Sequence, residues 1–224
     1  MKKLALTLIL AGCLLVPVSR AEKGDPLYTM AADRFFRLDR VGQPIDLSRI
    51  DKNLLSAAIF HETNQRRKNQ GLAPLDLLPG LHEAAEMHAN SMARGGYLSH
   101  TNPDDPKRKT PWDRVRLTGL KPSYVSENVA THFGIRYEPG TRAYPSKKNG
   151  DVRFSRTPGG PPIPNHTYRS IAESLLDQWM GSPPHRKNIV SERAHYLGAA
   201  CAKREPETRT AMVKFFCVQV FAAL

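Results

Sequence analysis

The sequence is poor in cysteine, with three in 224 residues, and poor in acidic residues, with 21 Asp and Glu against 33 Lys and Arg. So few cysteines exclude a small scaffold held by many disulfides, and a chain of this length can bury a core without them. No apolar run reaches the length of a confident membrane span, and 40% hydrophobic with 24% charged residues excludes wholesale disorder and a polytopic membrane protein. The sequence therefore predicts one basic globular domain with a net charge of +12.

Signatures of several enzyme classes are also missing. The sequence contains no Gly-rich phosphate loop, no Gly-x-Ser-x-Gly elbow, no Ser-x-x-Lys pair and no Cys-x-x-Cys motif. The segments that begin at His61 and His82 start like a zinc-protease helix, but each lacks a second His four residues later. We interpret these two residues and His88 as ordinary members of helix faces, and no motif supplies a catalytic nucleophile.

The first 21 residues are typical of a bacterial export signal. Two lysines precede an apolar stretch, and small side chains stand before a cleavage point after Ala21. Residues 10–13 (Leu-Ala-Gly-Cys) also resemble the lipobox of bacterial lipoproteins, in which the cysteine receives a lipid. Lipidation at Cys13 and cleavage after Ala21 are therefore the two alternatives, and the apolar residues 14–18 favour cleavage. Either route predicts an exported protein that is periplasmic, secreted or anchored to the membrane.

Apolar periodicity predicts three helices followed by a strand hairpin. The helices are expected over residues 47–70, 81–95 and 170–180, and the strands over residues 196–203 and 211–221. Helices first and the clearest strands last predict an α+β fold, with helices packed on an antiparallel sheet.

Cys201 and Cys217 fall on the two predicted strands of this hairpin. If the hairpin is centred near Arg209, the two cysteines lie opposite one another on the same face, within bridging distance. We favour a disulfide, since an exported protein folds where disulfides persist. The alternative is two buried free thiols that act as small hydrophobic residues.

Six short segments stand out in order along the chain. They are Asn-Gln-Arg-Arg (64–67), Tyr-Leu-Ser-His-Thr-Asn-Pro (97–103), Ser-Glu-Asn-Val-Ala (126–130), Trp-Met-Gly-Ser-Pro-Pro-His-Arg-Lys-Asn-Ile (179–189), Leu-Gly-Ala-Ala (197–200) and Phe-Cys-Val-Gln-Val-Phe (216–221). Together they resemble the bacterial branch of the CAP superfamily, the SCP domains related to cysteine-rich secretory proteins, venom antigens and plant pathogenesis-related proteins. The similarity extends over about residues 50–222, and it implies an α-β-α sandwich with a central antiparallel sheet. On this basis we divide the chain into a signal (1–21), an N-terminal extension (22–45) and an SCP domain (46–224).

The resemblance also implies a surface cleft that gathers two histidines and two glutamates. His100, His185 and Glu127 match three of these positions. The second glutamate does not follow the family pattern, because Ser182 occupies the position at which eukaryotic members carry it. Bacterial members more often carry acidic residues ahead of the helix tryptophan, which makes Glu173 the candidate, with Asp177 behind it.

Two interpretations of this cleft remain open. His100 and His185 could hold zinc or another divalent cation, with the carboxylates orienting the rings or adding a ligand. The same residues could instead form a neutral hydrogen-bond network, in which Glu127 holds backbone amides of neighbouring loops.

Three functions are compatible with these sequence features. We favour a non-catalytic binding module of the cell envelope or the exterior, because members of the family bind sterols, lipids, metals or proteins with no common reaction. The alternatives are a zinc-assisted hydrolase acting on protein or cell wall, with His100 or His185 as base, and a structural envelope protein that presents a loop.

Residues 134–169 form a basic loop that is longer than its bacterial counterparts. It holds seven basic residues against two acidic ones, with four aromatic residues between them. Export makes an anionic lipid or a cell-wall polymer the expected partner rather than nucleic acid. The alternative is a solvated lid over the sheet. Without the signal the net charge falls to +9, and this loop supplies five of those charges.

Overall fold

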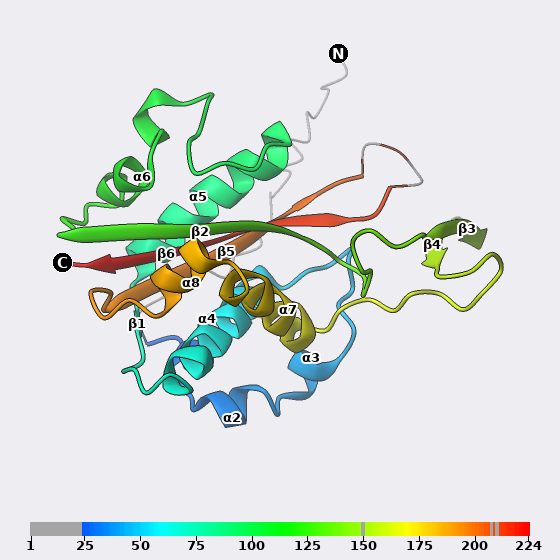
Figure 1. Ribbon diagram of the computed structural model, residues 1–224, viewed down its shortest axis with the longest axis horizontal. Helices are drawn as coiled ribbons and strands as arrows, with labels where there is room; N and C mark the ends of the chain where they lie inside the picture. The colour runs from blue at the N-terminus through cyan, green and yellow to red at the C-terminus, as the bar shows by residue number, and fades with distance from the viewer. Residues whose placement is uncertain (1–23, 149–150, 207, 209–210) are drawn as a thin grey trace, which may run out of the picture.

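The computed structural model describes residues 24–148, 151–206, 208 and 211–224, so the predicted signal and Cys13 lie outside the described residues. Four helices open the described chain, and helices and strands are mixed along the rest of it (Figure 1). The helical elements are α1 (Pro26–Thr29), α2 (Ala32–Phe35), α3 (Asp39–Gly42), α4 (Lys52–Lys68), α5 (Pro79–Gly95), the 3-10 turn η1 (Pro106–Arg108), α6 (Pro111–Leu117), α7 (Tyr168–Met180) and α8 (Pro183–Ile189). The strands are β1 (Asp76–Leu77), β2 (Tyr124–Phe133), β3 (Tyr144–Lys148), β4 (Asp151–Ser155), β5 (Tyr196–Arg204) and β6 (Lys214–Ala223).

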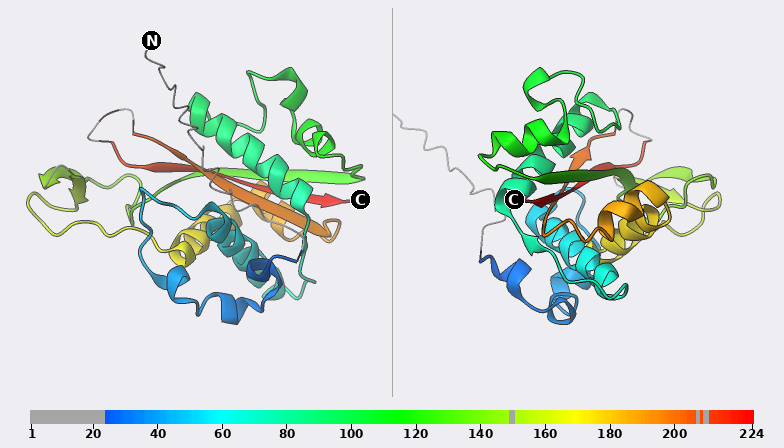
Figure 2. Two further views of the ribbon diagram at one scale, coloured as in Figure 1. Left: turned by 180° about the vertical axis from the view of Figure 1, so that it is seen from behind. Right: turned by 60° about the vertical axis from the view of Figure 1, so that its left-hand side comes forward.

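The central sheet has the strand order β1-β5-β6-β2, and every pair except the short parallel β1-β5 pair is antiparallel. Helices α5 and α6 lie on one face of this sheet, and α4 and α7 lie on the other (Figures 1 and 2). This arrangement confirms the predicted α+β class and the α-β-α sandwich. Strand β2 is an edge strand, which leaves one side of its backbone for other partners.

The three long helices occupy the regions that the apolar pattern predicts. Helix α4 begins later than expected, because Asp51 caps it by accepting a hydrogen bond from the backbone N–H of Leu54 at 2.9 Å. Helix α5 ends at Gly96, whose positive φ of 70° is the left-handed conformation that glycine adopts readily. Gly198 of β5 lies against the first turn of α5, where a Cβ would collide with the backbone of Leu81 and His82. The absent side chain lets helix and sheet approach closely.

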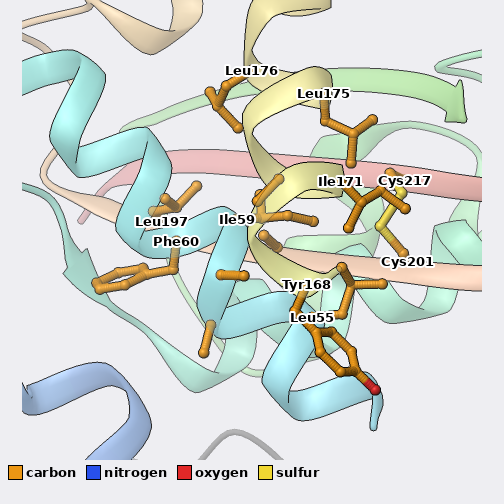
Figure 3. Close-up of a cluster of buried hydrophobic side chains, with 14 of the residues drawn as sticks. Leu55, Ile59, Phe60, Tyr168, Ile171, Leu175, Leu176, Leu197, Cys201 and Cys217 are labelled. Atoms are coloured by element: carbon orange, nitrogen blue, oxygen red, sulfur yellow. A yellow bond between two sulfur atoms is a disulfide. The ribbon is translucent and has the colours of Figure 1, made fainter. Parts of the chain in front are cut away.

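Alternation along the strands divides the apolar core into two clusters, one on each face of the sheet. The larger cluster joins α4 and α7 to the sheet, and Figure 3 shows side chains such as Ile59 and Ile171 meeting there. Cys201 and Cys217 face this cluster and form a disulfide between directly opposed residues of β5 and β6. The predicted disulfide is confirmed.

The segment before residue 46 packs into the same large cluster. Phe35, Val41 and Ile45 are buried, and the backbone carbonyl of Leu27 accepts a hydrogen bond from Nε2 of His61 at 2.7 Å. The predicted extension therefore covers α4 and contributes to the main core. None of the helices in the described ranges is long and apolar enough to cross a membrane.

The 134–169 loop leaves the sheet after β2 and carries a two-stranded ribbon, β3-β4, that projects from the body (Figure 1). Its two ends meet at a pair of histidines. The rings of His132 and His166 lie 4.9 Å apart between centroids in an edge-to-face arrangement. His166 is hydrogen-bonded to Oγ of Ser170, and His132 to Oγ of Ser174, so both rings are fixed to α7. This histidine pair closes the neck of the loop.

The neck should make stability depend on pH. Burial, with smaller contributions from the charges of His132 and Arg136, lowers the pKa of His166 to about 4. Unfolding returns this pKa to its ordinary value, so between about pH 6.5 and about pH 4 the unfolded chain binds a proton that the native chain does not. The free energy of unfolding contributed by His166 is therefore complete above about pH 6.5 and falls, by on the order of 3 kcal/mol, as the pH drops to about 4.

We expect His166→Gln to reduce this loss when urea unfolding of the purified protein is measured across the same pH range. The control is His195→Gln, which alters an exposed histidine and should keep the wild-type pH dependence. An unchanged dependence in His166→Gln would contradict this account of the neck.

Candidate functional site

The candidate site is organised around Glu127, a carboxylate on the edge strand β2. Its side chain is only 1% exposed. Oε1 accepts a hydrogen bond from Nδ1 of His100 at 2.9 Å, and Oε2 accepts one from Nη2 of Arg114 at 2.7 Å. Both carboxylate oxygens thus bind side chains, rather than the backbone amides expected from the sequence.

Arg114 is equally buried, and it holds the loop that leads to α6. Its guanidinium donates to the backbone carbonyls of Arg108 at 2.9 Å and His100 at 3.0 Å. Helix α6 is set in place by a capping box in which Thr110 and Asp113 satisfy each other's backbone N–H groups. The charge of Glu127 is therefore matched inside the protein, and the same cation fixes the backbone that carries His100.

His88 of α5 forms a hydrogen bond with the backbone of the loop that carries His100. Its Nε2 donates to the carbonyl of Ser99 at 2.6 Å and lies 3.9 Å from Oε1 of Glu127. Burial is the main reason that the pKa of His88 is lowered, so its ring is neutral at neutral pH. The residue that precedes His100 is consequently tied to the helix beneath it.

The next residue of β2 anchors the opposite face of the sheet. Asn128 lies across from Gln219 of β6 and donates to its side-chain oxygen at 3.1 Å. Gln219 in turn donates to Thr63 of α4 at 2.6 Å. Asn188 of α8 donates to the side chain of Asn128 at 2.8 Å and to the backbone carbonyl of Glu127 at 3.1 Å. Helix α8 thereby supplies a hydrogen-bond donor to one backbone carbonyl of the edge strand β2.

This anchoring places His185 of α8 beside the edge strand. Asn128 donates to the backbone carbonyl of His185 at 3.1 Å. The pKa of His185 is lowered by partial burial and, to a smaller degree, by the charge of His100. The influence of His100 on this pKa indicates that the two imidazoles lie within electrostatic range of each other. The side chain of His100 is 51% exposed and open to solvent.

Comparison with known proteins identifies the family. The model of the CAP family, described as the cysteine-rich secretory protein family, matches residues 60–221. The chain belongs to the CAP family.

The chain is distantly similar to several bacterial proteins, and it spans less than half the length of two of them. An uncharacterised Bacillus subtilis protein, YkwD, is 24% identical over 136 residues, which cover 61% of this chain and 38% of that protein. A solved extracellular protein containing an SCP domain from Bacillus anthracis has a TM-score of 0.51 at 20% identity, covering 81% of this chain and 45% of that one. An outer surface protein of Borrelia burgdorferi has a TM-score of 0.49 at 15% identity, covering 81% of this chain and 97% of that one. At 20% identity, the likeness to the Bacillus anthracis structure shows the fold alone.

The fourth predicted cleft residue, Glu173, is hydrogen-bonded within its own helix in the structure. Glu173 accepts a hydrogen bond from Arg169, one turn earlier on α7, at 2.7 Å. Asp177 pairs with Arg66 of α4 at 2.9 Å. The pKa of Glu62 on α4 is raised mainly by burial and, to a smaller degree, by the negative charges of Glu173 and Asp177. Among the described residues, neither carboxylate has a contact that reaches the CAP cleft. No group of three or more His, Cys, Asp or Glu in the described ranges is arranged to hold a metal ion.

Several residues of the CAP cleft have no signal in the sequence. Arg114 occupies a short helix with no functional motif, and His88 has the spacing of an ordinary helix-face residue. Asn128 and Asn188 do lie in the matched segments, next to Glu127 and close to His185. Their polar side chains beside the matched residues were the available sign of a hydrogen-bond network, since a buried amide on a strand needs partners.

The buried pair should make Glu127 important for stability. Glu127→Gln removes the charge opposite Arg114 and leaves a buried cation without its counter-ion, so we expect a loss of about 3 kcal/mol in the free energy of unfolding. The matched control is Glu173→Gln, which breaks an exposed pair and should cost less than about 0.5 kcal/mol. Urea unfolding at neutral pH measures both. Equal effects in the two variants would contradict a central role for Glu127.

Proposed function

We propose that the protein is an exported, non-catalytic binding module whose cleft holds a divalent cation such as zinc between His100 and His185. The observation that carries this proposal is the hydrogen bond between Nδ1 of His100 and Glu127, at 2.9 Å. When Nδ1 donates to a buried carboxylate, the tautomer of the ring is fixed and Nε2 keeps its lone pair. The half-exposed ring of His100 then offers that nitrogen to a ligand from solvent.

His185 supports the proposal because its lowered pKa keeps the imidazole neutral at neutral pH, which is the form that binds metal. The donor set fits a borderline cation, for which two imidazole nitrogens are favourable ligands. Two protein ligands make a weak, exchangeable site rather than a structural one. A cation held there would act as a Lewis acid towards the oxygen atoms of a further ligand.

The engagement of Glu127 argues against a hydrolase that uses a carboxylate as its base. Such an enzyme would need that carboxylate free and close to the attacking water. The histidines considered as bases, His100 and His185, are instead the ligands of the cation in this proposal. Both oxygens of Glu127 are occupied, one by His100 and one by Arg114, and the carboxylate is buried. The other acidic candidates also form ion pairs, Glu173 with Arg169 of α7 and Asp177 with Arg66 of α4. The described carboxylates near the cleft therefore serve to position side chains.

Three features support export. The N-terminal 21 residues are typical of a signal. The disulfide between Cys201 and Cys217 is a bond that persists in oxidising compartments. The Bacillus anthracis protein with the same fold is described as extracellular.

Calorimetric titration with zinc tests the proposal. We expect the purified protein to bind zinc with a dissociation constant of about 1 μM or weaker, because only two side chains contribute nitrogen ligands. His100→Ala and His185→Ala should each abolish the binding. Affinity should fall as the pH is lowered, since protonation removes the lone pairs that bind zinc.

The matched control is Glu173→Gln, which should bind zinc like the wild type. The same proteins should be assayed on casein and on isolated peptidoglycan. Zinc-dependent hydrolysis that is lost in both histidine variants would overturn the non-catalytic assignment, and zinc binding that survives both substitutions would overturn the site.

A further inference from the structure

We propose that the protein binds a small zwitterion with an apolar side chain, a free amino acid or a short peptide with free termini, in a cavity between the N-terminal segment and α4. The cavity lies between residues 28–33, the C-terminal half of α4 and residues 72–76, which lead into β1 (Figure 1). It belongs to the layer of α4, whereas His100 is held by Arg114 of α6 on the opposite face of the sheet (Figure 2). The inference goes beyond the cation cleft and does not depend on it.

The cavity has the size and the apolar lining of a small-molecule site. Its volume is about 540 Å³, within the range of such sites. Phe60 and Leu75 are its most buried apolar lining residues, and Met30 and Leu72 line it as half-buried residues. An apolar side chain of a ligand would gain free energy by leaving water for these contacts.

Hydrogen bonds fasten both walls of the cavity to α4. On one side, Asn64 donates to the backbone carbonyl of Leu75 at 3.0 Å and accepts from the N–H of the same residue at 2.8 Å. On the other side, Nε2 of His61 donates to the backbone carbonyl of Leu27 at 2.7 Å. The cavity is therefore formed before a ligand arrives, which lowers the entropy lost on binding.

Two unpaired charges of opposite sign line the cavity. Lys68 and Asp76 are exposed, and neither side chain forms an ion pair or a hydrogen bond with any described residue, the other of the two included. Asp33, the remaining charged side chain of the described lining, is already paired with Arg37 at 2.7 Å. A bound zwitterion would place its carboxylate at Lys68 and its ammonium at Asp76.

A buried hydrogen-bond acceptor also lines the cavity. Because Nε2 of His61 donates to a carbonyl, the lone pair of the ring is on Nδ1, and no described residue donates to that nitrogen. Burial lowers the pKa of His61, so the ring is neutral at neutral pH. An ammonium or a peptide N–H of the ligand is the kind of donor that satisfies Nδ1.

The same charges disfavour other classes of ligand. An uncharged apolar molecule would take water from Lys68 and Asp76 and give no hydrogen bond in return. An anion without an ammonium would pair with Lys68 but meet the negative charge of Asp76, and a cation would meet the reverse. A ligand that carries both charges avoids each of these costs.

Calorimetric titration with the dipeptide leucyl-phenylalanine tests the proposal. We expect saturable binding with a dissociation constant on the order of 50 μM. The N-acetylated dipeptide lacks the ammonium and the C-terminal amide lacks the carboxylate, so each should bind about tenfold more weakly. Free leucine is titrated in parallel, and the tighter of the two ligands identifies the cavity as a peptide site or as an amino-acid site.

Variants of the lining assign each charge to its partner. Lys68→Gln and Asp76→Asn should each weaken binding about tenfold. Amidation of the dipeptide should cause no further loss in Lys68→Gln, and acetylation should cause none in Asp76→Asn, because the partner of that charge is already gone. Ala31→Trp, at an exposed position of the lining, should fill the cavity and abolish binding. The matched controls are Lys121→Gln and Asp104→Asn, which remove exposed charges outside the lining and should bind like the wild type.

Three outcomes would overturn the proposal. One is the absence of saturable heat with both ligands at millimolar concentration. Another is equal affinity for the free, acetylated and amidated dipeptides, which would indicate an apolar groove that ignores charge. The third is binding that survives Ala31→Trp, which would place the ligand elsewhere. His100→Ala should leave these titrations unchanged and Ala31→Trp should still bind zinc, so failure here is separate from failure of the cation cleft.

Discussion

The ion pair between Glu127 and Arg114 is the interaction on which the arrangement of the cleft depends. Both side chains are 1% exposed, and their oxygen and nitrogen atoms are 2.7 Å apart. A buried charge is costly without its partner, so the pair constrains strand β2 and helix α6 to one relative position. The remaining carboxylate oxygen orients His100, and Nη1 and Nη2 of Arg114 also donate to the backbone of the loop that carries it. A single buried carboxylate thus links the fold to the solvent-exposed ring.

Successive residues of one edge strand connect the two layers of helices. Glu127 points to the layer of α5 and α6, whereas Asn128 points to α4 and α8 through Gln219 and Asn188. The cleft is therefore a product of sheet alternation at an unpaired edge.

Much of the fold could be predicted because its main elements have regular apolar patterns. Helices α4, α5 and α7 and the β5-β6 hairpin follow such patterns, and the hairpin register led directly to the bond between Cys201 and Cys217. Strand β2 was not predicted, because polar residues such as Glu127, Asn128 and His132 interrupt its alternation. Their partners are supplied by other segments, 13 residues away for Arg114 and 91 residues away for Gln219. Contacts of that kind leave no local pattern in the sequence. The family resemblance, rather than a local pattern, suggested Glu173, whose hydrogen bond in the structure is with Arg169.

The tautomer of His100 is the most direct test of this account. Nitrogen-15 NMR of the imidazole rings at neutral pH can assign the proton to one ring nitrogen in the wild type and in Glu127→Gln. The account predicts a ring protonated at Nδ1 with a free Nε2 in the wild type, and loss of this preference in the variant. A wild-type ring that carries its proton on Nε2 would contradict the claim that Glu127 prepares His100 to bind a ligand.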